Sequence, residues 1–294
     1  MLLGPLTLTA SLFLAAIDPR ATLFSPREIE FPFDDALRLP AGQINGGKLW
    51  RSHGLPDDGS AVPLVIFVHG IIFDGQRHHW LTVDPAGPWD ARPFMERLVD
   101  DGRITPLVVA VPSQVRDGID PSKLFVGLDF DDFVDRVDRE LSPYQRVDRQ
   151  RIVVVGHSGS ACNPDAAAYA SLSARTFTVR ALFSIDGCMS NESAQLLATT
   201  THARDVVVAY QDMVWERPFG DFLATYRLSL ARTHAPGIRA IDRFDGRSDG
   251  LAAENAHLEV VERTMERWLP MILPPERPPI DFDPSFGPTL AMLF

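Results

Sequence analysis

Cysteine and lysine are both scarce in this chain of 294 residues, which contains two cysteines and has Lys48 and Lys123 as its only lysines. Two cysteines are too few to hold together a small disulfide-stapled domain, so that class is excluded. Positive charge is also in the minority, because 28 Lys and Arg face 39 Asp and Glu and leave a net charge of −11. A chain this acidic lacks the basic surface that grips nucleic acid, and we expect no nucleic-acid partner. Its hydrophobic content of 45% excludes disorder of the whole chain and allows one large domain or two small ones.

The N-terminal segment 1–26 lacks what a secretion signal or a membrane span normally has. Residues 1–17 contain no charged side chain, so the basic start of a signal peptide is missing. This run is shorter than the ~20 apolar residues that cross a bilayer, and we expect no stable membrane span. The segment is either an export leader or an apolar arm on the domain, which leaves secreted, periplasmic and cytoplasmic locations open.

The C-terminal segment 271–294 is rich in proline, with seven prolines from Pro270 onward. Proline has a fixed φ and no backbone N–H, so it excludes regular helix or a central strand there. We expect an extended arm that either packs on the domain or docks on a second subunit in a homodimer.

Between these ends, short β-branched runs alternate with stretches that have a helical apolar rhythm. Runs that are apolar on both faces are typical of parallel strands covered by helices on each side. The apolar positions of Phe130–Leu141 and Leu258–Leu269 repeat at helical spacing and predict two of these helices. No internal repeat divides the chain, and we predict one doubly wound α/β domain over residues 27–270, with a mostly parallel sheet and helices on both faces. The expected strands are Leu64–Val68, Leu107–Val111, Ile152–Val155, Ala181–Ile185 and Val206–Tyr210, after antiparallel starter strands near Glu28–Phe33 and Gly47–Arg51.

The run Ile152–Ser160 leads a buried strand directly into a Gly-x-Ser-x-small turn. Such a turn forces Ser158 into a strained backbone conformation that exposes its hydroxyl above the sheet, while Gly156 relieves crowding between strand and helix. Ser160 stands where the pattern normally has Gly or Ala, and we interpret it as a tolerated departure because serine is also small. The pattern makes Ser158 a candidate nucleophile, with an ordinary helix-capping serine as the alternative.

Other segments supply the groups that a serine nucleophile needs. The strand Leu64–Val68 leads to Ile71, whose backbone N–H is expected to form an oxyanion hole with the N–H of Gly159. A serine hydroxyl is a weak nucleophile without a base, and His257, just before the last predicted helix, is the candidate. Asp212 follows the last predicted strand and completes the order Ser, acid, His.

With these motifs the sequence resembles the α/β-hydrolase superfamily over residues 28–270. The stretch Phe133–Ser158 is similar to the esterase D and feruloyl-esterase type, in which an L-x-PY element and a VD-x-x-R-I element precede the nucleophile turn. Here those elements are Leu141–Tyr144 and Val147–Ile152. The resemblance implies the α/β-hydrolase fold and a serine hydrolase.

The acid of the triad has a second candidate. Asp186 follows the strand Ala181–Ile185, and some α/β-hydrolases take their acid from that place. Asp245 and Asp249 also lie near His257 in the sequence. We predict Asp212 and keep Asp186 as the alternative acid.

A proline interrupts the segment that follows the nucleophile. Pro164 would remove a backbone hydrogen bond from a helix that began directly after Ser158. Asn163-Pro164 is instead typical of a helix start, with Asn163 as the N-cap. We therefore predict a distorted or delayed helix behind Ser158.

Both cysteines lie near the predicted catalytic edge of the sheet. Cys162 and Cys188 follow two neighbouring strands, so a disulfide between them is conceivable, and two free thiols are the alternative. His78 and His79 are adjacent, point apart and have no ligand cluster nearby. We expect no metal and no cofactor.

These features predict a serine hydrolase that cleaves carboxylic esters through an acyl-enzyme intermediate. The 17 residues between Gly187 and Asp205, and the 26 from Gln211 to Pro236, each have room for one helix, so no large cap domain is expected. An open site of this kind tends to accept small-molecule esters with bulky or extended acyl groups. Peptidase or amidase and thioesterase chemistry on the same triad are alternatives, as is a non-catalytic interaction module with a hydrolase fold.

Overall fold

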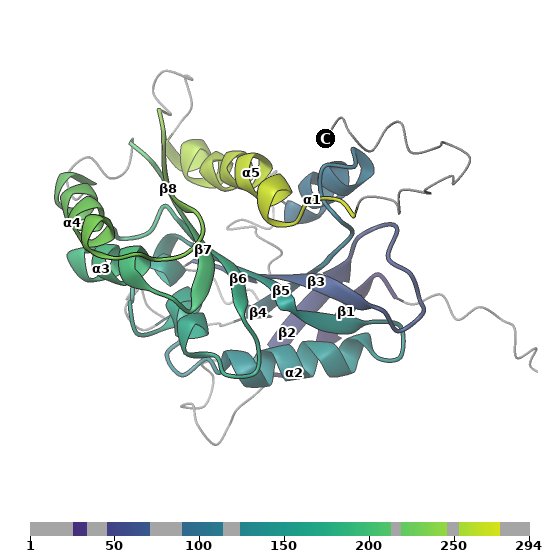
Figure 1. The fold of residues 1–294 in the computed structure, drawn as a ribbon. Coiled ribbons are helices and arrows are strands. Elements are labelled where there is room, and N and C mark those ends of the chain that lie inside the picture. The colour runs from purple at the N-terminus through teal and green to yellow at the C-terminus, as the bar shows by residue number, and fades with distance from the viewer. Residues whose placement is uncertain are drawn as a thin grey trace, which may run out of the picture.

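One sheet of eight strands forms the centre of the protein in the computed structural model, which describes residues 26–33, 46–70, 90–113, 124–212, 219–245 and 253–276. The strand order is β1-β2-β4-β3-β5-β6-β7-β8 (Figure 1). β1 pairs with β2 and β2 pairs with β4 in antiparallel register, and the remaining pairs are parallel. The strands are β1 (Glu28–Phe31), β2 (Gly46–Arg51), β3 (Ala61–Val68), β4 (Val108–Ser113), β5 (Arg146–His157), β6 (Val179–Ile185), β7 (Ala203–Gln211) and β8 (Arg239–Phe244).

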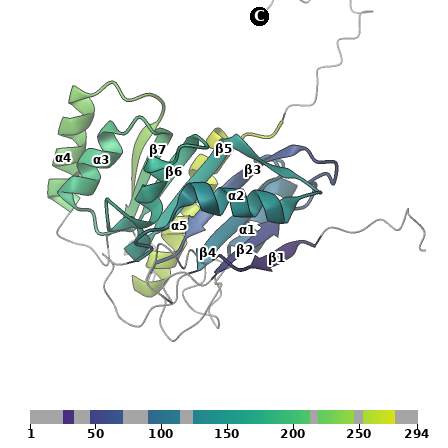
Figure 2. The same cartoon turned by 90° about the horizontal axis from the view of Figure 1, so that it is seen from below.

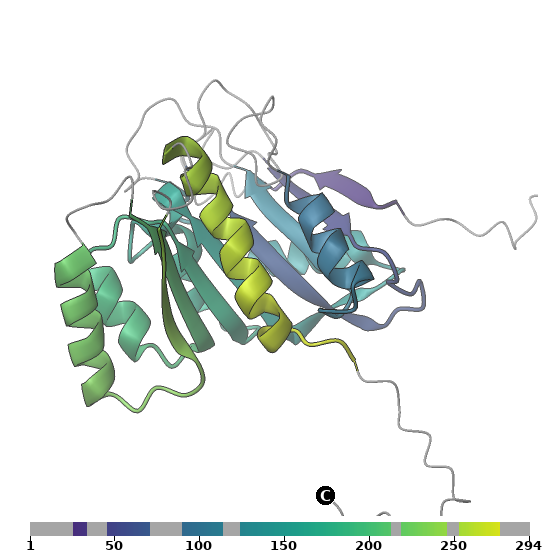
Figure 3. The ribbon, with the colours of Figure 1, turned by 90° about the horizontal axis from the view of Figure 1, so that it is seen from above.

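Helices cover both faces of the sheet. Seen from below in Figure 2, α2 lies across one face, with α3 and α4 beside it. Seen from above in Figure 3, α5 and α1 lie across the opposite face. Among the described residues, one helix follows β6 and one follows β7, as the loop lengths predict. The helices are α1 (Ala91–Asp100), α2 (Phe130–Leu141), α3 (Asn191–Thr199), α4 (Phe219–Arg232) and α5 (Ala253–Ile272).

The central strands are apolar on both faces because each face has its own hydrophobic core. In β3, Leu64 and Ile66 pack into the core under α2, whereas Val65 and Phe67 pack into the core under α5. Alternate residues of a strand point to opposite faces, so a strand covered on both sides needs a continuous apolar run. The predicted doubly wound sheet and its antiparallel starter strands are confirmed.

The prediction did not include β8. Its six residues include Arg239, Asp242 and Arg243, and it pairs only with β7 at the edge of the sheet. An edge strand is partly solvated, so it lacks the continuous apolar run by which the central strands were recognised.

The expectation that proline excludes regular helix from residue 270 onward is wrong at Pro270 itself, because α5 continues to Ile272. A proline inside a helix leaves the carbonyl four residues earlier without its partner. Here that carbonyl belongs to Glu266, and it accepts a hydrogen bond of 2.8 Å from Arg103 Nη2. The lost backbone bond is thereby replaced from outside the helix.

The segments 1–25 and 277–294 lie outside the described residues, so the leader and the docking arm stay predictions. None of the helices that the structure describes is both long and apolar enough to cross a membrane.

Two methionines on α5 allow the packing of this helix to be measured with one kind of substitution. Met265 is fully buried, and Met271 is 51% exposed on the same helix. We expect Met265→Ala to lower the free energy of unfolding by about 2–5 kcal/mol, because it leaves a cavity in the core. Met271→Ala should change it by about 0.5 kcal/mol or less. Equilibrium urea unfolding measures both, and similar values for the two variants would contradict the packing of α5 described above.

Candidate active site

Strand β5 ends in the turn that presents Ser158. The backbone of Ser158 has a φ of 57°, in the left-handed region that residues other than glycine rarely adopt. The short 3-10 helix η2 (Ser158–Ala161) begins at this residue. Ser158 is partly exposed, whereas the three residues after it are buried. The predicted strained turn is confirmed.

Two glycines make room for this turn. A Cβ atom on Gly156 would lie 2.5 Å from that of Ala168, and one on Gly70 would lie 2.7 Å from that of Ser158. Contacts this short do not occur between real side chains, so both positions need glycine. The crowding expected at Gly156 is confirmed. The need for glycine at position 70 was not predicted, although its place two residues after the end of β3 was a usable signal.

Ser160 has a structural role that the sequence pattern did not indicate. Its side chain is fully buried, and its Oγ lies 2.6 Å from the carbonyl oxygen of Val68 and accepts a hydrogen bond of 2.9 Å from the backbone N–H of His157. The hydroxyl therefore joins the end of β3 to the end of β5. An alanine or glycine could not make this link.

The segment behind Ser158 is not an α-helix. After η2 the chain forms a turn in which Asn163 Oδ1 accepts a hydrogen bond of 2.9 Å from the N–H of Asp165, and a second 3-10 helix, η3 (Ala167–Ser173), follows. Ala167 has a φ of 50°, which no regular helix contains. The predicted distortion is confirmed, but the predicted helix start at Asn163 is wrong.

Tyr169 on η3 fastens this irregular segment to the sheet. Its hydroxyl lies 3.1 Å from the carbonyl oxygen of Ala161 and 2.8 Å from the Oγ of Ser184 in β6. Burial raises the pKa of Tyr169 to about 12. The phenol therefore stays protonated at neutral pH and can donate to the orphaned carbonyl of η2.

His257 lies against Asp186 and not against Asp212. Nδ1 of His257 is hydrogen-bonded to Oδ2 of Asp186, which is fully buried, while the His257 side chain is 21% exposed. Asp212 instead accepts a hydrogen bond of 2.7 Å from Arg243 Nη2. This arrangement corrects the prediction of Asp212 as the partner of His257 and favours the alternative, Asp186.

The register of the parallel strands explains the difference. His157 pairs with Ile185, so the next residues, Ser158 and Asp186, leave the sheet side by side. Ile185 pairs in turn with Ala209 of β7, so Asp186 is level with Tyr210, and Asp212 lies two residues beyond that level. At about 3.3 Å per residue this places Asp212 about 7 Å further along the strand direction than Asp186. Its sequence position after β7 did not reveal this extra length.

His157 holds the backbone of His257. Its Nε2 donates a hydrogen bond of 2.9 Å to the carbonyl oxygen of His257, and the two rings have centroids 4.4 Å apart. Burial lowers the pKa of His157 well below its ordinary value of 6.5, and the nearby His257 lowers it further. His157 is therefore neutral at pH 7, with one N–H that this carbonyl occupies. The sequence indicated His257 but gave no signal for this contact of His157.

A disulfide joins the serine segment to the acid segment. Cys162, four residues after Ser158, is bonded to Cys188, two residues after Asp186, with a Cα–Cα distance of 4.7 Å. Between them, Gly187 packs so closely on the carbonyl of Ala161 that a side chain would not fit. The conceivable pairing of the two cysteines is thus formed, and it holds the two segments at a short separation.

No hydrogen bond among the described residues joins the Ser158 hydroxyl to the His257 ring. Hydrogen bonds between catalytic groups are often long before substrate binds and tighten in the complex. Gly159 is the second residue of η2, so its N–H has no acceptor within that helix. Ile71, predicted to supply the other oxyanion donor, lies outside the described residues, as do His78 and His79.

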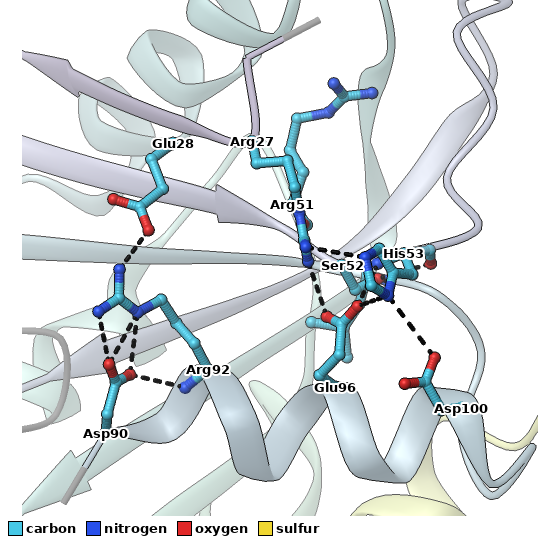
Figure 4. A network of polar contacts seen from close by, with 10 residues as sticks. Arg27, Glu28, Arg51, Ser52, His53, Asp90, Arg92, Glu96 and Asp100 are labelled. Carbon is cyan, nitrogen blue, oxygen red and sulfur yellow. Dashed lines mark hydrogen bonds and ion pairs between the residues drawn. The ribbon is translucent and has the colours of Figure 1, made fainter.

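A second polar cluster lies away from this site, between β2 and α1 (Figure 4). The side chains of His53, Glu96 and Asp100 place ligand-type atoms within 4.8 Å of one another. Arg27 Nη2 donates to Glu96 Oε2 at 3.0 Å, and its Nη1 lies 2.8 Å from His53 Nε2. Arg27 thus provides positive charge to this cluster, which ties the start of β1 and the end of β2 to α1.

The strand order, the parallel register and the strained turn after β5 together define the α/β-hydrolase fold. The structure is similar to a solved ferulic acid esterase, with a TM-score of 0.50 and 12% sequence identity over 78% of this chain and 91% of that one. It is also similar to a solved thermostable esterase, with a TM-score of 0.52 and 16% identity over 83% of this chain and 62% of that one. No protein-family model matches the sequence, and no curated protein does. At sequence identities this low, the structural similarity shows a shared fold and nothing further.

Removing the disulfide tests how firmly it holds the two segments. The bridge closes a loop with a sequence separation of 26 residues. We expect Cys162→Ser/Cys188→Ser to lower the free energy of unfolding by about 3 kcal/mol, because the unfolded chain gains conformational freedom. Urea unfolding with and without reductant measures this, and reductant should destabilise the native chain and leave the double variant unchanged. Thiol titration confirms that the reduced native chain has two free thiols. If that reduced chain keeps its full stability, the prediction is wrong.

Proposed function

We propose that this protein is a serine hydrolase that cleaves carboxylic esters, with Ser158 as nucleophile, His257 as general base and Asp186 as the acid. The observation that carries the proposal is the hydrogen bond between Asp186 and Nδ1 of His257. It leaves Nε2 as the nitrogen that can accept a proton, and it is formed beside a serine whose backbone is strained in the turn after β5. A serine, a histidine and a buried carboxylate in these places are the groups that acyl transfer requires.

In the proposed reaction, Nε2 of His257 takes the proton of the Ser158 hydroxyl as Oγ attacks the ester carbonyl. The negative oxygen of the tetrahedral intermediate accepts hydrogen bonds from the backbone N–H groups of Gly159 and Ile71. The intermediate collapses when the ester C–O bond breaks, and His257 returns the proton to the departing alcohol. Water, deprotonated by His257, then attacks the acyl carbon, the bond from this carbon to Ser158 Oγ breaks, and His257 returns the proton to Oγ as the acid is released. Asp186 stabilises the imidazolium in both steps.

An ester is proposed as the substrate for two reasons. The two solved structures described above are both named as esterases. The stretch Leu141–Ile152 also has the two sequence elements that precede the nucleophile in the esterase D and feruloyl-esterase type. A panel of p-nitrophenyl esters, thioesters and aminoacyl amides tests this choice. Hydrolysis of amides or thioesters alone would reassign the substrate class while keeping the serine mechanism.

Labelling by a fluorophosphonate tests the nucleophile directly, because this probe reacts with an activated serine. We expect one equivalent of label on Ser158 and none in Ser158→Ala, whose ester hydrolysis should fall by roughly a thousandfold or more. Ser173→Ala, an exposed serine on η3, is the control and should label fully. If the folded protein takes no label and Ser158→Ala behaves like the native chain, the proposed function is wrong.

Two matched substitutions decide which carboxylate is the acid. We expect Asp186→Asn to lower kcat by roughly 10³- to 10⁴-fold, because an amide cannot hold His257 in the required tautomer. Asp212→Asn should lower kcat by less than about tenfold, since its carboxylate pairs with an exposed arginine. Steady-state kinetics on one ester measures both variants. A larger loss in Asp212→Asn would return the acid role to Asp212.

A further inference from the structure

Gln211, the last residue of β7, holds both carboxylate oxygens of Asp186. Its backbone N–H donates to Oδ1 at 3.3 Å, and its side-chain Nε2 donates to Oδ2 at 3.0 Å. Both residues are fully buried. Gln211 was not singled out in the sequence, because a glutamine at a strand end is not part of any catalytic motif.

The two hydrogen bonds constrain the carboxylate in different ways. A single bond would leave the group free to rotate, whereas one donor on each oxygen fixes its plane. Oδ2, which receives the Nε2 bond, is also the oxygen that faces Nδ1 of His257. Donors to a carboxylate favour its charged form, and a buried charge without them is costly. The amide therefore aims this carboxylate and supplies a hydrogen bond to its buried Oδ2.

Few other groups among the described residues contact the Asp186 carboxylate and could orient it. Its backbone has a φ of 49°, and its N–H is already bonded to the carbonyl of Ala209 at 2.8 Å. Within the described residues, the titratable groups in hydrogen-bond or ring contact with the Asp186–His257 pair are these two and His157. The side chain that aims the carboxylate is a neutral amide, so it adds no positive charge that would compete with His257 for Asp186.

We propose that Gln211 is a positioning residue of the active site, which acts on the reaction through Asp186 and does not touch the substrate. This rests on the proposed function, in which Asp186 orients the base. A residue of this kind changes the rate of the chemical step. It does not change how tightly the substrate binds.

Gln211→Met tests the proposal, because methionine has a similar length and no amide donor. We expect kcat on a p-nitrophenyl ester to fall about tenfold, as for a lost hydrogen bond to a charged group, with KM unchanged. Loss of the side-chain donor leaves the carboxylate with the backbone N–H alone, so its plane is no longer fixed and the loss should fall on the chemical step. Fluorophosphonate titration corrects each rate for the fraction of active protein.

Gln145→Met is the matched control. Gln145 is also buried, and its Nε2 donates to the carboxylate of Asp57 at 3.1 Å. It lies directly before β5, at the end of that strand opposite to Ser158. We expect this variant to keep the native kcat and KM. An unchanged kcat in Gln211→Met, or a change in KM alone, would overturn the positioning role.

A spectroscopic readout keeps this test separate from the test of the proposed function. We expect the proton between His257 Nδ1 and Asp186 to give a far-downfield NMR signal that needs no turnover, and Asp186→Asn to identify it by its loss. We expect Gln211→Met to shift or broaden this signal and Gln145→Met to leave it unchanged. If the native chain hydrolyses no ester, the proposed function fails, and this signal still decides the role of Gln211. An unchanged signal in Gln211→Met overturns the positioning role in either case.

Discussion

The parallel pairing of β5 with β6 is the constraint on which the candidate site depends. Because His157 pairs with Ile185, Ser158 and Asp186 leave the sheet at the same level and on neighbouring strands. Both residues then turn sharply, with φ values of 57° and 49°. A slip in this register would move Asp186 about 3.3 Å per residue along the strand direction and away from His257. The geometry of the candidate site therefore depends on backbone hydrogen bonds between buried residues of two strands.

Strain of this kind persists only where the surrounding structure holds it in place. Here the support comes from several directions. Ser160 joins the turn to the end of β3, and Tyr169 joins it to β6. The Cys162–Cys188 bridge connects the segments that follow Ser158 and Asp186. The segment after Ser158 forms 3-10 turns around Pro164 and not a regular α-helix, so it lacks regular helical hydrogen bonds. The side-chain links and the disulfide hold it in place instead.

His257 reaches the candidate site from the face of the sheet opposite to α2. His257 lies near the start of α5, which packs on the core through Val261, Met265 and Leu269. The far end of α5 contains a proline, and the helix continues there because Arg103 occupies the orphaned carbonyl of Glu266. His157 holds the carbonyl of His257 at the other end of the helix. The position of the imidazole is thus set by packing along the whole helix and by one buried neutral histidine.

The amino-acid sequence determined the architecture, because apolar runs and helical periodicity respond directly to burial on both faces of a sheet. It also indicated Ser158 and His257 as candidates, because their signals lie in neighbouring residues. Ser158 is in the turn after a strand, and His257 is near the start of a helix. From the sequence we predicted Asp212 as the partner of His257 and kept Asp186 as the alternative, and the sequence showed neither the edge strand β8 nor the contacts of Gly70, Ser160 and Gln211. These depend on which strand ends lie at the same level and on which backbone groups approach from other strands. Register and close packing are relations between segments distant in the chain, so only the tertiary structure decided them.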